Sequence, residues 1–369
     1  MKAQVPADLK EHNRMLVYQL VRSGGAISKS GIARRLGLSV PTVLKIVEYF
    51  RGLGILGDAG EGESALGRKP MLMSTQATAA FAVGAEYDGV HLSVGLVDLA
   101  GNVLALRRSP APPDLALLLG GLLADEVEAL IRDSGVQSGL VKGLGVGVPG
   151  VVHSKELCIS QAPLVGINAR FNFSTLMSIL RDRLGLPVHV ANDANAAALG
   201  ELAARRAGSG GDLIFVELGR GVGAGLVLDG RLREGPGSGA GEIGYMVLDS
   251  KAHRVASGPG WLESAMNLPA FWAEVDGGGS PSKESLHRVC HFLALGLSNL
   301  CIALDVGNVV LGRAGKESFG PALLECLRQE LHSLCPMDIS CEFSRAGEPG
   351  VTGAAGLALD EWVKAICAA

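Results

Sequence analysis

The sequence predicts an α/β protein that begins with a winged helix-turn-helix and continues as an open α/β body of two lobes around a cleft. Two observations predict this fold class. Residues 1–75 contain short helical segments joined by a glycine turn, followed by two strand-like segments. From Thr75 onward, apolar strands alternate with helices, and Gly-rich loops follow several of the strands.

Composition agrees with a globular chain of two or three domains, since one domain takes about 100–200 residues. Apolar residues make up 48% of the 369 residues and charged residues 19%, which excludes a disordered chain. The seven cysteines form an odd set without a C-x-x-C pair. They favour reduced thiols in a cytoplasm over a disulfide framework or a zinc knuckle.

Neither a signal peptide nor a membrane span is predicted. The first ten residues lack the apolar centre of a signal peptide. The nearest approach to a spanning segment, Leu115–Leu130, is interrupted by Asp125, Glu126 and Glu128. We therefore expect a cytoplasmic protein with no membrane partner.

Charge is divided unevenly along the chain. Residues 1–70 carry 11 Lys or Arg and 6 Asp or Glu, a net of +5, so the remainder carries −9 of the total −4. A basic end on an acidic body indicates that one part meets a polyanion, although chance clustering gives the same pattern.

The first helix is predicted over Asn13–Ser23 from apolar residues at helical spacing. Ser28 then caps a short helix that Gly37 ends, and Ser39 caps the next helix. Two short helices about a glycine turn match a helix-turn-helix, the alternative being an ordinary helical hairpin. Docked as in such domains, the second helix turns five residues toward base edges or phosphates: Ser39, Val40, Pro41, Thr42 and Lys45.

A wing is predicted next. The strand-like segments Gly54–Leu56 and Pro70–Met73 bracket a Gly-rich loop whose end carries Arg68 and Lys69. A basic tip of this kind reaches a narrow minor groove, while the loop's three acids keep its outer part from the phosphates. Residues 1–75 are thus predicted as a winged helix-turn-helix domain with double-stranded DNA as its partner.

The body is predicted from alternating strands and helices. Strands are expected within Phe81–Leu104 and at Gly143–Val148, Pro187–Ala191, Asp212–Leu218 and Val309–Leu311. Helices are expected at Leu115–Ser134, Leu176–Leu184, Leu262–Trp272, Lys283–Leu304, Ala322–Ser333 and Gly353–Ile366.

Asn192 and Asp193 stand where a buried strand meets a helix of small residues, the place where α/β proteins bind ligands. An ionised Asp is a strong acceptor of hydroxyl hydrogens, and Asn both donates and accepts. Asp is also a preferred helix N-cap, so Asp193 by itself fits capping and ligand binding equally well.

Five motifs in order resemble the ROK family of repressors, open reading frames and sugar kinases. They are G-V-G-V-P-G at 145–150, N-D-A-N-A-A-A-L-G-E at 192–201, G-x-G-x-G at 221–225, G-A-G-E-I-G-Y at 239–245 and V-T-G-A-A at 351–355. The resemblance covers essentially the whole chain, including the winged helix of the family's repressor branch. It implies an actin-like (ribonuclease H-like) ATPase-type fold with a sugar between two lobes.

On this resemblance residues 76–369 form the sugar-binding domain. Lobe one takes about 76–195 plus the C-terminal helix 353–369, and lobe two takes about 196–350. The family's sugar-binding positions correspond here to Gly150, Asn192, Asp193, Glu242, Tyr245 and Glu263, with Tyr245 in place of a His. For Glu242 the competing interpretation is a surface acid in a loop, and for Glu263 an ordinary acid in a helix's first turn.

The sequence departs from the family's kinases at the phosphate loops. Their D-x-G-G-T is here Glu86-Tyr87-Asp88-Gly89-Val90, so a carboxylate stands where phosphates would bind and the Thr hydroxyl is lost. Their late Gly-Gly is Gly312-Arg313, and Arg220 replaces a small hydroxyl residue in the surviving Gly219–Gly225 loop. These changes argue against ATP binding and against kinase activity.

The family's zinc ligands, a His and three cysteines, are replaced as well. Their positions carry Tyr245 and the run Arg254–Trp261, and His253 alone cannot hold a structural zinc. We predict no metal and no other cofactor. Tyr245 and Trp261 are expected to brace this loop by packing, or one of them to stack on a sugar face.

The sequence is compatible with three functions. The first is a sugar-responsive transcriptional regulator, a repressor of carbohydrate-utilisation genes that binds a sugar or sugar phosphate and acts as a homodimer or homotetramer. The second is an ATP-dependent sugar kinase that carries a DNA-binding domain, with Asp193 as general base. The third is a regulator that answers a protein partner rather than a sugar. The retained sugar-site residues and the altered phosphate loop favour the first, with Asp193 non-catalytic.

Overall fold

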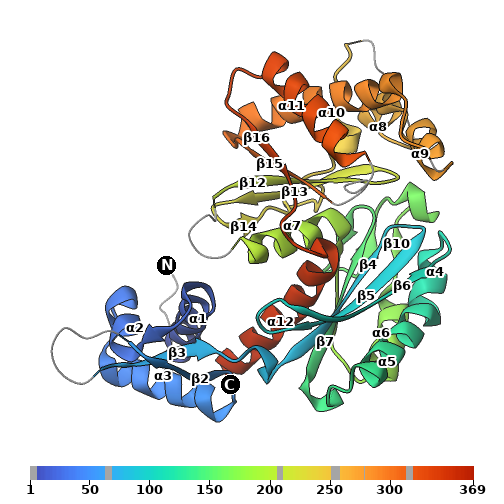
Figure 1. The fold of residues 1–369 in the computed structure, drawn as a ribbon. Helices are drawn as coiled ribbons and strands as arrows, with labels where there is room; N and C mark the ends of the chain where they lie inside the picture. The colour runs from blue at the N-terminus through green and yellow to red at the C-terminus, as the bar shows by residue number, and fades with distance from the viewer. Residues whose placement is uncertain (1–5, 63–68, 206–210, 251–257, 278, 313–318) are drawn as a thin grey trace.

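The computed structural model describes residues 6–62, 69–205, 211–250, 258–277, 279–312 and 319–369. Three parts follow one another: a small N-terminal domain, a first lobe and a second lobe (Figure 1). The longest connection between them is the C-terminal helix α12, Pro349–Ala368, which runs from between the lobes to the N-terminal domain. The predicted fold class is confirmed.

The N-terminal domain has three helices and a small antiparallel sheet of order β1-β3-β2. Its elements are α1 (Pro6–Gly24), β1 (Ile27–Ser28), α2 (Lys29–Leu36), α3 (Val40–Gly52), β2 (Leu56–Glu61) and β3 (Met71–Thr75). Ser28 and Ser39 cap α2 and α3 as expected, accepting the amides of Gly31 at 3.0 Å and Thr42 at 3.3 Å. The left-handed Gly37, with φ of 65°, ends α2. These local signals set the helix-turn-helix geometry.

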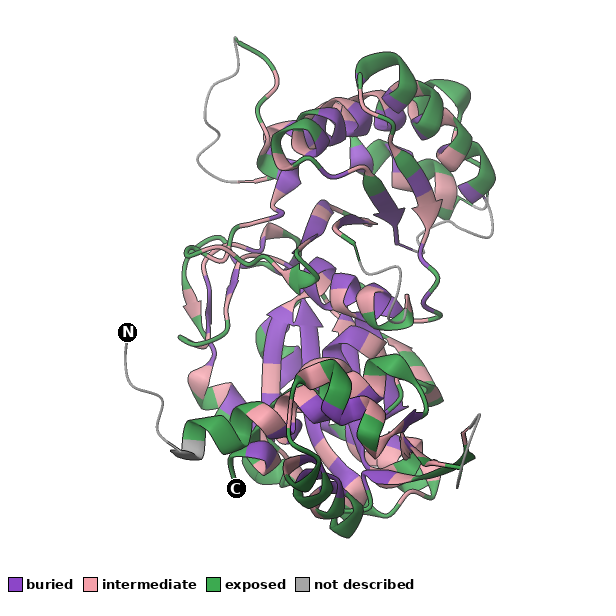
Figure 2. Cartoon of the chain, turned by 90° about the vertical axis from the view of Figure 1, so that its left-hand side faces the viewer, coloured by how far each residue is buried: buried purple, intermediate pink, exposed green. Residues whose placement is uncertain are grey.

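Lobe one is built on a five-stranded sheet of order β11-β7-β4-β5-β6. The strands are β4 (Phe81–Tyr87), β5 (His91–Asp98), β6 (Val103–Pro110), β7 (Val141–Val148) and β11 (Val188–Asn192). Helices α4 (Leu115–Leu117), α5 (Leu123–Ser134) and α6 (Ser174–Leu184) cover one face, and α12 packs on β4 and β7. The central strands β4 and β7 are almost wholly buried (Figure 2). A small sheet, β8 (Val152–His153), β9 (Cys158–Ile159) and β10 (Phe171–Asn172), lies beside them.

Lobe two holds a second five-stranded sheet, of order β14-β13-β12-β15-β16. Its strands are β12 (Leu213–Leu218), β13 (Val222–Leu228), β14 (Arg231–Leu232), β15 (Asn308–Leu311) and β16 (Ser340–Phe343). One face is covered by α8 (Trp261–Met266), α9 (Leu268–Asp276), α10 (Lys283–Leu304) and α11 (Gly320–Leu334). The other face packs on α7 (Asp193–Ala204).

Helices α7 and α12 cross between the two sheets, and glycines make the crossing close. A Cβ on Gly353 would lie 1.7 Å from the Ala196 carbonyl oxygen, and one on Gly200 would lie 2.0 Å from that of Pro349. Neither position has room for any side chain, so the two helix backbones touch directly. The small residues of the 192–201 and 351–355 motifs therefore allow the two helices to pack closely.

A buried carboxylate fastens the segment that leads into α12. Glu201, fully buried near the end of α7, accepts hydrogen bonds from Ser344 Oγ at 2.6 Å and from the Arg345 amide at 3.0 Å. Arg205 neutralises it at 2.8 Å. The last residue of the 192–201 motif thus holds the connection between the lobes, a structural role that its carboxylate fills without any ligand.

The far end of α12 belongs to the core of the N-terminal domain. Val363 and Cys367 are buried together with Val17, Tyr18 and Phe50. The last turn accepts hydrogen bonds from the winged domain: Arg14 Nη1 donates to the Cys367 carbonyl at 3.0 Å, and the Tyr49 hydroxyl donates to that of Ile366. The DNA-binding domain is therefore packed against the end of a helix whose other end lies between the lobes.

Several predicted elements differ from those observed. The helix expected over Leu115–Ser134 contains a π-turn at Leu118–Leu122, where Gly121 leaves helical geometry. The helix expected over Leu262–Trp272 breaks at Asn267, whose left-handed φ of 54° separates α8 from α9. α12 begins four residues before Gly353, since Pro349 is tolerated in a first turn. Strands β1, β6, β8, β9, β10, β13, β14 and β16 were not predicted as separate elements.

The segment nearest to a membrane span is α10 rather than Leu115–Leu130. α10 is long and apolar enough to cross a membrane by length and composition. Its apolar face nevertheless packs in the core of lobe two, with Val289, Leu293 and Leu297 all fully buried. We interpret α10 as a core helix.

Gly353→Ala tests the α7–α12 crossing. The added methyl has no room against the Ala196 carbonyl, so we expect the free energy of unfolding to fall by about 3 kcal/mol. Gly356→Ala, in the same helix with open space at its Cβ, is the control and should raise stability by about 0.5–1 kcal/mol. Urea unfolding measures both variants, and equal effects would contradict the close crossing.

Candidate functional site

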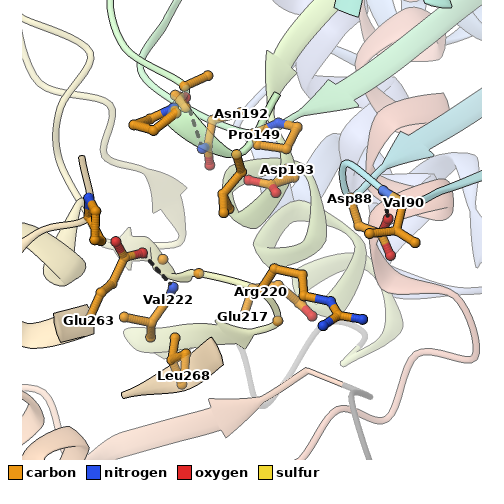
Figure 3. Close-up of a pocket in the computed structure, with 18 of the residues that line it drawn as sticks. Asp88, Val90, Pro149, Asn192, Asp193, Glu217, Arg220, Val222, Glu263 and Leu268 are labelled. Atoms are coloured by element: carbon orange, nitrogen blue, oxygen red, sulfur yellow. Dashed lines mark hydrogen bonds between the residues drawn. The ribbon is translucent and has the colours of Figure 1, made fainter. Parts of the chain in front are cut away.

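A cavity of about 1040 Å³ lies between the two lobes, where the ends of β4, β7, β11 and β12 face each other. All six sequence-predicted sugar-site residues line it: Gly150, Asn192, Asp193, Glu242, Tyr245 and Glu263. Figure 3 shows Asn192 and Asp193 on one side of the cavity, with Glu217, Arg220 and Glu263 across from them and Asp88 to one side.

Asn192, not Asp193, caps α7. Asn192 Oδ1 accepts the Asn195 amide at 2.9 Å, and Asn192 Nδ2 donates to the Gly150 carbonyl at 3.1 Å. Asp193 is the first residue of the helix, and its Oδ1 accepts the neighbouring Ala194 amide, at 2.8 Å. The capping role weighed for Asp193 therefore belongs to its neighbour, which leaves Asp193 an oxygen for a ligand in the cavity.

Gly150 is required by the protein's own backbone. It adopts a φ of 98°, and a Cβ here would lie 2.2 Å from the Gln161 carbonyl oxygen. This glycine lets two loops come into contact at the edge of the cavity. Its carbonyl accepts a hydrogen bond from Asn192 Nδ2.

Glu263 is engaged by backbone amides on two sides. Oε1 accepts the Val222 amide at 2.9 Å, and Oε2 accepts the Gly260 amide at 3.1 Å, which completes the first turn of α8 (Figure 3). Glu263 therefore stabilises the first turn of its helix, as the competing interpretation expected. The same side chain also fixes the Gly-rich turn before β13. The side chain of Glu263 also lines the cavity.

Glu242 and Tyr245 lie on the loop before α8. No hydrogen bond engages the Glu242 carboxylate among the described residues, and burial, Asp193 and Glu263 raise its pKa to about 7. Burial also raises the pKa of Tyr245 to about 12. Trp261 does not line the cavity; it packs edge-on against Phe292, with ring centroids 6.0 Å apart. Of the two roles considered for Trp261, packing is the one observed.

Sequence reasoning missed three carboxylates that also line the cavity, Glu217, Asp276 and Glu348. Glu217 is the next-to-last residue of β12 and lies beside Gly312, and Glu348 precedes α12 and pairs with Arg108 at 2.5 Å. Burial and nearby carboxylates raise the pKa of Glu86 to about 7, and they raise that of Glu217 well above its usual range. Burial raises the pKa of Asp193 to about 6. The cavity is therefore strongly acidic.

A second surface lies on the N-terminal domain. Ser39, Val40, Pro41 and Lys45 are exposed at the start of α3, and Thr42 is half-buried with its hydroxyl 2.8 Å from Ser39 Oγ. In the wing, Lys69 is exposed, whereas Arg68 lies outside the described residues. The predicted DNA-facing residues of α3 thus share one end of one helix.

The ROK family matches residues 82–361, which is most of the chain. The chain belongs to the ROK family. It is 25% identical to the xylose repressor of Caldicellulosiruptor bescii over 357 residues, and 24% identical to that of Bacillus subtilis over 342 residues. Each of these alignments covers 88% of both chains. It is also 26% identical over 250 residues to NagC of Escherichia coli, a DNA-binding transcriptional dual regulator, covering 68% of this chain and 61% of NagC.

Solved structures support the ROK fold. A ROK family transcriptional regulator, a homologue of the E. coli MLC protein, aligns with a TM-score of 0.71 over 98% of this chain and 99% of that one, at 20% identity. A ROK glucokinase from Streptomyces griseus, in complex with glucose and AMPPNP, aligns with a TM-score of 0.60 over 76% of this chain and all of that one, at 22% identity.

The turn between β4 and β5, predicted to correspond to the first phosphate loop of ROK kinases, is closed by its own side chain. Asp88 stands in the turn between β4 and β5, and its Oδ1 accepts the amides of Val90 at 2.8 Å and His91 at 2.6 Å (Figure 3). These are backbone donors of the kind that bind phosphate oxygens in such turns. A carboxylate already occupies them.

The second ROK glycine loop is mostly a strand. Residues 222–225 belong to β13, and a Cβ on Gly225 would lie 2.3 Å from the Ala198 Cβ, so this glycine lets α7 pack on the sheet. Arg220 forms an ion pair with Asp276, at 2.6 Å. Arg313, at the family's late Gly-Gly, lies outside the described residues.

The ROK zinc site does not fit the residues present. Tyr245 stands at the His position and Trp261 packs in the lobe core, and neither offers a zinc ligand. His253 and Arg254–Ser257 lie outside the described residues. Within the described part of the chain, no three His, Cys, Asp or Glu side chains are placed to hold a metal ion.

The Glu86→Gln variant tests how much the buried negative charge of the cavity costs in stability. Because the native pKa of Glu86 is raised from 4.5 to about 7, stability should fall as pH rises through that window, and the charged form is least favourable above pH 7. We expect the variant to gain about 1–3 kcal/mol of unfolding free energy at pH 8 and little at pH 4.5. Urea unfolding at both pH values checks this. Glu284→Gln, at a highly exposed position, is the control that should change neither.

Proposed function

We propose that the protein is a sugar-responsive transcriptional repressor of sugar-utilisation genes. The winged helix-turn-helix binds double-stranded operator DNA, and the cavity between the lobes binds a sugar without phosphorylating it. The observation that carries the proposal is the joining of the two surfaces: α12 packs against β4 and β7 at one end and against the winged domain at the other. The repressor names of its full-length relatives support the same conclusion.

On this proposal residues 1–75 form the DNA-binding domain and 76–369 the sugar-binding domain. Lobe one takes about 76–195 with the C-terminal helix 353–369, and lobe two about 196–350. Operator DNA places the protein in the cytoplasm, and paired winged helices require a homodimer or homotetramer.

Sugar recognition is assigned to the six predicted residues of the cavity. Asp193 and Glu242 accept sugar hydroxyls, because their carboxylates keep oxygens free of strong protein donors. Asn192 and Glu263 hold the walls of the cavity in place and offer their remaining donors and acceptors. Tyr245 borders the site from the loop, and Gly150 shapes its edge.

A nucleotide phosphate would meet two obstacles in this cavity. Asp88 already accepts the turn amides that a phosphate would need. Burial and mutual repulsion already disfavour the charged forms of Glu86, Glu217 and Asp193, and the negative charge of a phosphate in the same cavity would add to that cost. Arg108 and Arg220 do not relieve the repulsion, since each is paired with a carboxylate of its own. We infer that the protein is not a kinase, although Asp193 matches the position of a kinase base.

The carboxylates of the cavity also influence which kind of effector binds there. A sugar phosphate brings about two negative charges at neutral pH, and the cavity offers it carboxylates on most sides. A neutral sugar donates hydroxyl hydrogens to those carboxylates without this repulsion. We therefore favour an unphosphorylated sugar over a sugar phosphate as the effector.

The proposal is tested by gel retardation with DNA from upstream of the protein's own gene. We expect the purified chain to retard this fragment, and one sugar of a panel of xylose, glucose and N-acetylglucosamine to release it. The phosphate ester of that sugar should need at least about ten-fold higher concentration, by electrostatic repulsion. No retardation of any upstream fragment at low salt would overturn the DNA-binding role; release by the phosphate ester alone would overturn the choice of effector.

Asp193→Asn tests the role of this carboxylate. The substitution keeps the volume but removes the charged acceptor, so we expect calorimetry to show sugar affinity lowered about 10–100-fold. Thermal unfolding should be unchanged or higher, because a buried charge is removed. Asp182→Asn, exposed on α6 away from the cavity, is the matched control. ADP release by the wild-type chain with any sugar of the panel would contradict the non-enzymatic assignment.

A further inference from the structure

The exposed face of α3 is apolar where a recognition helix meets base edges. The helix buries Val43, Ile46 and Val47 in the domain core. It leaves Val40 48% exposed and Leu44 40% exposed. These two residues are four apart and therefore neighbours on one face of the helix.

Little hydrogen-bonding capacity remains on that face. Thr42 Oγ1 lies 2.8 Å from Ser39 Oγ, so the cap engages it. Glu48 pairs with Lys29 at 3.2 Å, and Arg51, at the end of the helix, pairs with Asp58 at 3.3 Å. Lys45 is the one exposed charged side chain of α3 for which no ion pair is found among the described residues. α3 also contains no Asn or Gln, the side chains that bind adenine edges.

We propose that Val40 and Leu44 recognise thymine methyl groups in the major groove, and that Leu44 is a specificity-determining residue of this repressor. Thymine is the base that offers an apolar group there, its C5-methyl. The operator half-site then carries thymines at the positions opposite these two side chains. The inference rests on the proposed DNA-binding function and specifies which chemical groups of the DNA are recognised.

The surroundings of the apolar face fit DNA better than a protein partner. Exposed Arg34 and Arg35 lie on α2, the helix that crosses the DNA backbone in this docking, and Lys45 follows Leu44 directly. A basic border around a small apolar centre complements phosphates on either side of a groove. A second copy of this chain would bring the same basic residues against these and be repelled.

The test uses the full chain and the operator sequence that it selects from a random double-stranded library. Each thymine of the selected site is replaced in turn by deoxyuridine, which removes the 5-methyl group and leaves base pairing unchanged. Fluorescence anisotropy should show about four-fold weaker binding at one or two positions in each half-site, the effect of one buried methyl at about 0.8 kcal/mol.

Leu44→Ala should weaken binding to the thymine operator by a similar factor and abolish the loss on deoxyuridine substitution at one of those positions. Leu53→Ala, 45% exposed just after α3, is the matched control and should retain both affinity and thymine preference. Uniform binding to thymine and deoxyuridine operators would overturn the inference while leaving DNA binding intact. An altered oligomeric state of Leu44→Ala, with unchanged DNA preference, would overturn it in favour of a second copy. Failure to select any sequence would instead overturn the proposed function itself.

Discussion

The close crossing of α7 and α12 is the contact on which the rest of the structure depends. Gly200 and Gly353 bring the two helix backbones together, and the sheets of both lobes pack on this pair. α7 begins at the cavity with Asn192 and Asp193, so the packing of its small residues also fixes where these side chains stand. The buried Glu201 ties the connection into α12 to the same helix. Packing and site are thus set by one pair of helices.

This arrangement joins two surfaces that a repressor has to connect. Glu348, immediately before α12, borders the cavity and pairs with Arg108, while Cys367 in its last turn accepts a hydrogen bond from Arg14 of the winged domain. Any ligand that favours one arrangement of the lobes acts on a helix that is part of the winged domain's own core. Differential affinity for two such arrangements is what a sugar response requires.

The sequence was sufficient to predict structure where the signals lie within a few neighbouring residues. Ser28, Ser39 and Gly37 specify caps within a few residues, and a buried strand followed by Asn192 identifies the strand–helix junction. It was insufficient where distant segments meet: Glu217 reaches the cavity only because β12 is paired between β13 and β15, and Glu263 meets Val222 across the loop. Two-residue strands such as β8 carry too short a pattern to predict. Leu44 did leave a signal, since it lies four residues after Val40.

The closed turn at Asp88 has a consequence for the physiology of the proposed repressor. On the proposed function, a turn with free amides would offer donors to a nucleotide phosphate, and the effector response would then vary with the energy charge of the cell. Here the donors of that turn are occupied by a side chain of the same chain, at 2.8 and 2.6 Å. On the proposed function, the protein therefore reports the supply of a sugar and not the supply of ATP with which to use it.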